Sequence, residues 1–300
     1  MIYTVTLNPC SDYVIGIDSI KTGELNRTNR EEIFIGGKGI NVSLVLKELG
    51  VRSVAMGFVA GFTGTEIEKR LNEVGIETDF VRLKDGNSRI NVKILSEQET
   101  EINARGPEIS EGDIKEFFDK LDTLKDDDVL VLSGSVPSSM PSDIYETILK
   151  RLSGKKIMTV ADASGDLLKR TLKYKPFLIK PNNVELGELF GVKLKTADEC
   201  EEYARRLKEM GAVNVLVSLA GEGALLIDKD GKGHKIKAFG GKVINSVGAG
   251  DSMVAGFIAG MLKGDSGYAL RLGAACGAAT AFSEGIAKRE DIEKLFGKLS

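Results

Sequence analysis

Two glycine-rich segments carry the residues best suited to chemistry. Near the C-terminus, Gly248, Ala249, Gly250 and Asp251 precede a long apolar run. Residues with little or no side chain let a ligand approach the backbone, and the first turn of a helix presents unpaired N–H groups. The pattern therefore predicts an anion site. A carboxylate in that place fits a transferring phosphoryl group, with Asp251 accepting the proton of the attacking hydroxyl.

A structural interpretation of Asp251 is also open, because Asp is a preferred N-cap residue. The segment Gly36-Gly37-Lys38-Gly39-Ile40-Asn41 favours the chemical interpretation, since it is a second glycine-rich turn that enters a helix, and it carries a cation. Its spacing matches neither the Walker A motif nor the dinucleotide fingerprint. Two anion-binding helix starts suit an enzyme that handles two phosphorylated ligands.

Several polar residues could hold a sugar phosphate. Asp12 follows the first predicted strand and Asn41 starts a helix, so both could bind sugar hydroxyls. Arg89 and Arg105 flank a predicted hairpin and, with Lys38, could hold a phosphate monoester by charge-assisted hydrogen bonds. For either arginine alone, an exposed strand charge is the plainer interpretation.

Two further segments follow predicted strands. Asn182 and Glu185 open a helix after the strand at 177–179, where they could hold waters around Mg²⁺ or only cap the helix. Ser218, Gly221 and Gly223 lie where a buried strand ends in a glycine-rich turn. That turn is either a nucleotide contact or a tight loop.

Composition restricts the partners, the compartment and the kind of catalysis that we expect. The 300 residues carry a net charge of −3 with 28% charged residues, so we expect neither nucleic acid nor a membrane as partner. The widely spaced cysteines predict free thiols in a reducing compartment, and no apolar run reaches transmembrane length, so we expect a cytoplasmic protein. The single histidine, His234, falls in a predicted polar turn, which argues against histidine-based catalysis.

The chain alternates between strand and helix patterns. Apolar runs such as 129–132 and 213–217 are typical of parallel strands covered on both faces, and they alternate with segments of helical period. Segments near 12–35 and 87–105 alternate polar and apolar residues instead, which predicts a small sheet with one wet face. We expect one doubly wound α/β domain over 1–300, with a β lid built from these two insertions.

Together the two glycine-rich segments resemble the two signatures of the PfkB (ribokinase-like) carbohydrate kinases. Residues 4–9 (TVTLNP), Lys38 and residues 88–93 (SRINVK) are similar to the branch that phosphorylates sugar phosphates. The resemblance implies ATP and Mg²⁺ as cofactors and conversion of fructose 1-phosphate to fructose 1,6-bisphosphate. Tagatose 6-phosphate and fructose 6-phosphate are alternative substrates, and a non-catalytic sugar-phosphate sensor is the alternative from another class. Pairing of lid sheets in a homodimer is a further expectation.

The resemblance also implies a role for each matching residue. Asp251 would be the catalytic base, beside an anion hole made by the backbone of Gly248, Ala249 and Gly250. The sugar would be held by Asp12, Gly36, Gly37, Asn41 and Ser133 or Ser135, and its phosphate by Lys38, Arg89 and Arg105. ATP and Mg²⁺ would be bound by Lys180, Asn182, Glu185, Ser218, Gly221 and Gly223. Ala220 departs from the family pattern, which has glycine there, and Cys10 stands where the branch has alanine.

Overall fold

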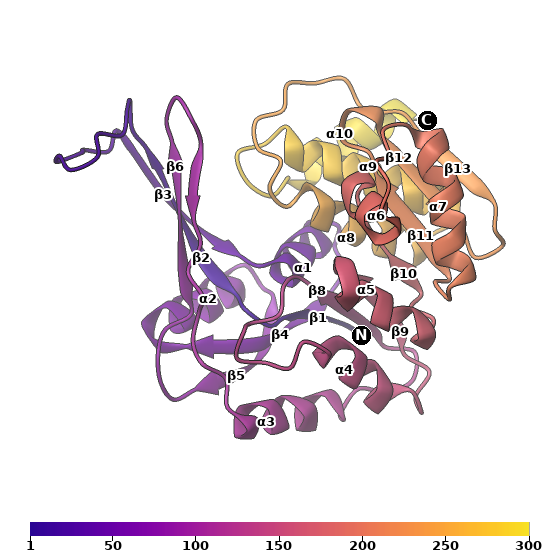
Figure 1. Ribbon diagram of the computed structural model, residues 1–300, viewed down its shortest axis with the longest axis horizontal. Coiled ribbons are helices and arrows are strands. Elements are labelled where there is room, and N and C mark those ends of the chain that lie inside the picture. Colours follow the sequence, from indigo (N-terminus) through magenta and orange to yellow (C-terminus); the bar gives the residue numbers. More distant parts are fainter. Residues whose placement is uncertain (300) are drawn as a thin grey trace.

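A nine-stranded sheet forms the centre of the computed structural model, which describes residues 1–299 (Figure 1). Its strand order is β13-β12-β11-β10-β9-β8-β1-β4-β5, and all neighbours are parallel except β11–β12 and β12–β13. The strands are β1 (Ile2–Thr6), β4 (Ser53–Ala60), β5 (Glu77–Leu83), β8 (Val129–Ser133), β9 (Met158–Asp162), β10 (Leu178–Ile179), β11 (Asn214–Ser218), β12 (Ala224–Ile227) and β13 (Gly233–Ile236).

Helices cover both faces of this sheet, which is why central strands such as β8 are buried along their whole length. The face covered by α3–α7 encloses the larger apolar core, and α1, α2 and α8–α10 cover the other face. None of the described helices is long and apolar enough to cross a membrane. The helices are α1 (Lys38–Glu48), α2 (Gly61–Glu73), α3 (Glu111–Leu121), α4 (Ile144–Leu152), α5 (Gly165–Thr171), α6 (Asn183–Phe190), α7 (Ala197–Glu209), α8 (Ala249–Met261), α9 (Ser266–Ala281) and α10 (Arg289–Phe296).

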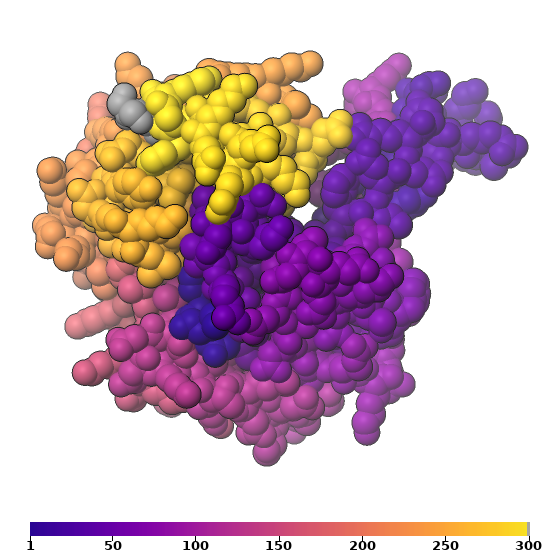
Figure 2. Space-filling view, turned by 180° about the vertical axis from the view of Figure 1, so that it is seen from behind, coloured from indigo at the N-terminus to yellow at the C-terminus, as the bar shows by residue number. Residues whose placement is uncertain are grey.

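A separate small sheet contains four strands in the order β3-β2-β6-β7, and it stands away from the body of the molecule (Figures 1 and 2). Its strands are β2 (Cys10–Gly16), β3 (Arg30–Gly36), β6 (Arg89–Leu95) and β7 (Thr100–Ile102). The chain enters it directly from the carboxyl end of β1 and leaves β3 directly into α1. The small sheet is therefore attached at the edge of the large sheet where polar strand ends gather.

Local interactions determine several helix ends and helix contacts. Ser110 and Asp113 form a capping box at the start of α3, and Thr196 and Glu199 form one at the start of α7. α9 packs closely on Gly256 and Gly260 of α8, because a Cβ on either residue would lie 2.8 Å or less from backbone atoms of α9. These glycines let α8 and α9 approach closely.

One strand was not predicted, and one residue expected in a turn lies in a strand. The edge strand β5 was not predicted, because the sequence ETDFVRL mixes charged and apolar residues. It shows neither the two-residue period of a strand nor the 3.6-residue period of a helix. His234 lies within β13 instead of in an exposed turn, and its Nε2 is 2.6 Å from Asp228 Oδ2. The imidazole is used in this local pair, away from the glycine-rich segments.

Candidate active site

The two glycine-rich helix starts meet at one hydrogen bond. Gly37 precedes α1 with φ 130°, Gly248 precedes α8 with φ 79°, and neither helix has a side-chain cap. Asn41 Nδ2 donates to Asp251 Oδ2 across 2.8 Å. Asp251 lies in the first turn of α8, after the N-cap residue Gly248, so the N-cap interpretation of this carboxylate was wrong.

The Asp251 carboxyl is buried and poised to accept a proton. Only 4% of the residue is exposed, and desolvation by burial, followed by the negative charge of Asp162, raises its pKa to about 6. The hydrogen bond from Asn41 and the charges of Lys38 and Lys180 act in the opposite direction. A carboxyl with this pKa is ionised at neutral pH yet more basic than an exposed Asp, as a general base requires.

Sequence reasoning missed Asp162, the most connected carboxylate of the site. It ends β9 and is buried, with Lys38 Nζ 3.4 Å from Oδ2, Lys180 Nζ 3.4 Å from Oδ1, and Ser133 Oγ donating to Oδ2 across 3.1 Å. Burial acts to raise the pKa of Asp162, but Lys180, Lys38 and Ser133 together hold it below its ordinary value. A signal was present, because polar residues at the carboxyl ends of parallel strands meet at one edge of a sheet.

Lys180 brings this cluster to the start of α8. The residue is 5% exposed, and a Cβ built on Gly250 would lie 3.0 Å from Lys180 Nζ. The ammonium group therefore lies over the backbone of the first helical turn. It adds positive charge where the helix N-terminus already favours an anion.

Asp12 lies within β2 of the small sheet, as the lid predicted near 12–35 implies. Its Oδ1 accepts hydrogen bonds from Asn91 Nδ2 at 2.8 Å and from Cys10 Sγ at 3.3 Å. A Cβ on Gly36 would lie 2.4 Å from Asp12 Oδ2, so only glycine leaves room for this carboxylate. Asp12 and the Gly36-Gly37 turn are thus neighbours.

Asn8, which sequence reasoning did not single out, forms hydrogen bonds with the Arg89 side chain and with the Arg105 backbone. Arg89 Nε donates to the Asn8 carbonyl at 3.1 Å, and Asn8 Nδ2 donates to the Arg105 carbonyl at 2.8 Å. The Lys38 ammonium was expected beside these arginines, but its ion-pair partner is Asp162. Burial alone would lower the pKa of Lys38, but the charges of Asp162, Asp251 and Glu185 raise it.

Asn182 and Glu185 form a reciprocal capping box at the start of α6. Glu185 N–H donates to Asn182 Oδ1 and Asn182 N–H donates to Glu185 Oε2, each across 2.8 Å. The cap uses one carboxylate oxygen of Glu185. The negative charge of Glu185, with those of Asp162 and Asp251, raises the pKa of Lys38. Mg²⁺ keeps several waters and is also held by substrate phosphates, so one carboxylate such as Glu185 fits it without a cage of protein ligands.

The glycine-rich turn after β11 lies beside this cap, because Ser218 pairs with Asn182 in an isolated parallel bridge. Gly223 has φ 102°, and a Cβ there would lie 2.0 Å from the Ile236 carbonyl oxygen, so its glycine is explained by packing. Gly221 is exposed, as is Ser135 in the loop after β8. Ala220 has φ 47°, a conformation that favours glycine.

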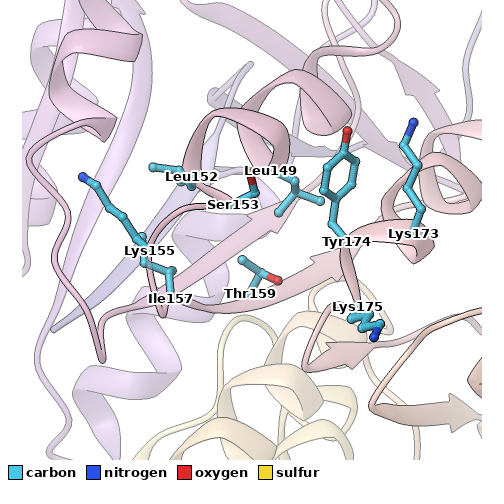
Figure 3. A pocket seen from close by; sticks show the side chains of 9 residues that line it. All are labelled: Leu149, Leu152, Ser153, Lys155, Ile157, Thr159, Lys173, Tyr174 and Lys175. Atoms are coloured by element: carbon cyan, nitrogen blue, oxygen red, sulfur yellow. The ribbon is translucent and has the colours of Figure 1, made fainter.

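One surface pocket, of about 260 Å³, lies at the opposite edge of the large sheet. Figure 3 shows it beside Ile157 and Thr159, at the amino end of β9, whereas Asp162 ends that strand. Lys155 Nζ donates to the carbonyls of Asp122 and Leu124, so this cation is already satisfied. Within residues 1–299, no group of three His, Cys, Asp or Glu side chains forms a metal cage.

Comparisons with known proteins agree with this geometry. Residues 4–292 match the model of the pfkB family carbohydrate kinases. A 1-phosphofructokinase of Bacillus subtilis is 46% identical, covering 98% of this chain and 97% of its own, and a D-tagatose-1-phosphate kinase of Bacillus licheniformis is 38% identical, covering 98% and 96%.

A solved structure also superposes on this chain over its full length. Phosphofructokinase-2 of Escherichia coli, in complex with substrates and products, superposes with a TM-score of 0.93 at 26% identity, covering 99% of each chain. The predicted ribokinase-like fold, a mostly parallel sheet flanked by helices with a separate small sheet, is confirmed. The chain belongs to the PfkB family of carbohydrate kinases.

Proposed function

We propose that this kinase transfers the γ-phosphoryl group of ATP to fructose 1-phosphate, which gives fructose 1,6-bisphosphate and ADP. The observation that carries the proposal is the convergence of both glycine-rich helix starts on Asp251. This carboxylate is buried, its pKa is raised to about 6, and it lies next to backbone N–H groups that favour an anion. The full-length similarity to a 1-phosphofructokinase supports the choice of substrate.

The reaction is an in-line displacement at phosphorus. The acceptor hydroxyl oxygen bonds to the γ-phosphorus while the bond from that phosphorus to the departing oxygen of ADP breaks. The hydroxyl proton passes to Asp251, whose carboxylate Asn41 holds in place. The backbone of Gly248, Ala249 and Gly250 stabilises the phosphoryl oxygens, together with Lys180. The Lys38 and Lys180 ammonium groups both pair with Asp162. We therefore place Lys38 at the transferring phosphoryl group instead of at the sugar's own phosphate.

The sugar phosphate lies between the small sheet and the start of α1. Asp12 and the Gly36-Gly37 turn bind its hydroxyl groups, and Ser135 borders the same space. Arg89 and Arg105, linked through Asn8, bind the existing phosphate by charge-assisted hydrogen bonds. The placement of Asp12 against Gly36 supports this arrangement.

ATP occupies the edge formed by α6 and the turn after β11. Lys180, Ser218, Gly221 and Gly223 contact the nucleotide, and Asn182 and Glu185 hold Mg²⁺ through water. When bound there, Mg²⁺ neutralises charge on the β- and γ-phosphates. The bridge between Asn182 and Ser218, which joins the two segments, supports a shared site.

The small sheet acts as a lid and as a dimer surface. Its Asp12 face turns toward the active site, and Arg30 of β3 forms an ion pair with Glu284 at 3.2 Å. The opposite face carries Ile33, Ile90 and Ile102, which are 50%, 41% and 59% exposed. Such an apolar face supports pairing with a second copy, so Ile90→Asp should convert a dimer to a monomer in light scattering. An unchanged mass would remove this part of the proposal.

The substrate assignment is tested by ADP release with Mg-ATP and a panel of sugar phosphates. Fructose 1-phosphate should exceed fructose 6-phosphate, tagatose 6-phosphate and tagatose 1-phosphate in kcat/KM by at least about tenfold, or about 1.4 kcal/mol of transition-state preference. The tagatose 1-phosphate arm matters because a relative carries that name. Preference for a 6-phosphate would show that the sugar binds in the reverse orientation.

The same assay excludes the sensor alternative, since a non-catalytic sensor releases no ADP with any sugar phosphate. The burial of a raised-pKa carboxyl at the helix start argues against a sensor, which has no use for a base. The three cysteines are free thiols in the structure, which supports action in a reducing compartment such as the cytoplasm.

A further inference from the structure

The Asp12 carboxylate is held through one of its two oxygens. Asn91 Nδ2 and Cys10 Sγ both donate to Oδ1, at 2.8 and 3.3 Å. β2 and β6 are parallel neighbours (Figure 1). Asp12 is paired with Asn91 and Cys10 with Arg89, so these side chains share one face of the small sheet. Among residues 1–299, no hydrogen bond reaches Oδ2.

The second oxygen, Oδ2, borders the glycine-rich turn before α1. A Cβ on Gly36 would lie 2.4 Å from Asp12 Oδ2 and 2.5 Å from Cys10 Sγ. No other residue type fits at position 36 without displacing this pair. The oxygen therefore faces the Gly36-Gly37 turn, where the proposed function places the sugar hydroxyls.

Asn91 uses only its donor end. The residue is 5% exposed, and its Oδ1 is buried without a hydrogen-bond partner. The carboxylate of Asp12 can only accept, so the amide group must present its NH₂ to Asp12 and leave its carbonyl unpaired. A buried unpaired acceptor lowers stability, and it is tolerated where the donor on the same side chain serves a function.

Cys10 is a second buried donor. It is 2% exposed, and burial, followed by the nearby charge of Asp12, raises its pKa to about 12. The thiol therefore keeps its proton at neutral pH and remains able to donate.

We infer that Asn91 and Cys10 are positioning residues that fix Asp12 through Oδ1, so that Oδ2 accepts a hydrogen bond from a sugar hydroxyl. This inference rests on the proposed function and adds two residues to which that function assigns no role. Loss of either donor frees the carboxylate to rotate away from the sugar. The effect falls on the KM for the sugar phosphate and leaves the KM for ATP unchanged.

Asn91→Asp tests the first donor with little change of shape. It replaces the NH₂ group by an oxygen and places two carboxylates in contact, so we expect kcat/KM for fructose 1-phosphate to fall about 10- to 100-fold at pH 8. As the pH falls toward 6, a proton shared by the two carboxyls restores a donor, because like charges in contact raise one pKa. The ratio of variant to wild-type kcat/KM should therefore rise at lower pH, which a packing defect would not cause.

Cys10→Ala and Cys10→Ser test the second donor. We expect about a three- to tenfold rise in the sugar-phosphate KM for the alanine variant and near wild-type behaviour for serine, which keeps a donor. Cys200→Ala is the matched control, since it removes a buried thiol from α7, away from the small sheet. The control should leave both KM values unchanged.

The outcomes separate this inference from the function on which it rests. If wild-type protein releases ADP with fructose 1-phosphate, but Cys10→Ala matches Cys200→Ala and the Asn91→Asp ratio does not change with pH, the inference is wrong and the function stands. A fall in kcat at constant sugar-phosphate KM would also overturn it. If wild-type protein uses no sugar phosphate, the proposed function fails and the inference fails with it.

Discussion

Helices α1 and α8 both begin after a glycine with positive φ, and neither has a side-chain cap. Their first turns differ in charge. The first residue of α1 is Lys38, and its first turn contains no acidic residue, whereas that of α8 contains Asp251 and no cation. The Lys38 ammonium is paired with Asp162, while the Asp251 carboxylate receives a neutral amide donor from α1.

This difference shows how one backbone arrangement serves two tasks. A cation paired directly with Asp251 would lower its pKa and weaken it as a base. Asp162 instead binds both Lys38 and Lys180, and its own negative charge contributes to raising the pKa of Asp251. α8 therefore presents the base, while α1 and Asp162 set the pKa of that base.

Removing the base should give the largest effect. Asp251→Asn is expected to lower kcat about 10²- to 10⁴-fold, as loss of a general base does, with little change in ATP affinity. The folded-state pKa of Asp251 lies above its ordinary 3.8, so the folded protein binds more protons between about pH 4 and 6 and loses stability as pH rises through that window.

At pH 7 the asparagine variant should therefore be as stable as the wild type or more stable, by about 1–3 kcal/mol. Chemical denaturation at pH 7 measures this difference, and ADP release measures the turnover. Near-normal turnover in a folded variant would show that Asp251 is not the base.

A glycine-to-alanine substitution should have different effects at the two helix starts. A Cβ on Gly39 in α1 would lie 2.6 Å from the Val5 carbonyl oxygen, so Gly39→Ala should destabilise the fold by about 1–3 kcal/mol. A Cβ on Gly250 in α8 would instead meet the flexible end of Lys180 at 3.0 Å. Gly250→Ala should lower kcat about tenfold with little loss of stability. Equal losses of stability in thermal unfolding would contradict the distinction.

Ala220 provides the smallest test, because it holds a positive φ without being glycine, unlike Gly37 and Gly248. Ala220→Gly should relieve left-handed strain of about 1 kcal/mol, partly offset by the greater freedom of glycine when unfolded. We expect a slightly higher midpoint of thermal unfolding and unchanged kcat. A lower midpoint would show that the alanine is not strained.

The parts of the molecule that local chemistry determines were predicted from sequence. Glycine-rich turns and capping residues act within a few positions, so both helix starts and the cap of α6 were located correctly. The contact between Asp12 and Gly36 did not follow from local signals, because the two residues were assigned to one sugar site only through the family resemblance.

Contacts between distant segments could not be predicted in the same way. Asn41 and Asp251 are 210 positions apart, and no spacing rule shows that one donates to the other. Lys38 was expected at the sugar's own phosphate, but its ammonium is paired with a strand end 124 positions away. Asp162 itself was missed although it ends a parallel strand, because no glycine-rich turn or cation stands beside it in sequence.

The pH dependence of kcat tests our account of the base most directly, in wild-type protein and in two variants. Wild-type activity should fall as the pH drops through about 6, when Asp251 takes up a proton. Asp162→Asn removes a negative charge that raises this pKa, so its acid limb should move to lower pH. Asn41→Ala removes a hydrogen bond that lowers the pKa, so its acid limb should move to higher pH. If the acid limbs of the two variants move in opposite directions, α1 and Asp162 set the pKa of the base. Acid limbs that move in the same direction, or a wild-type profile without an acid limb near pH 6, would contradict this role.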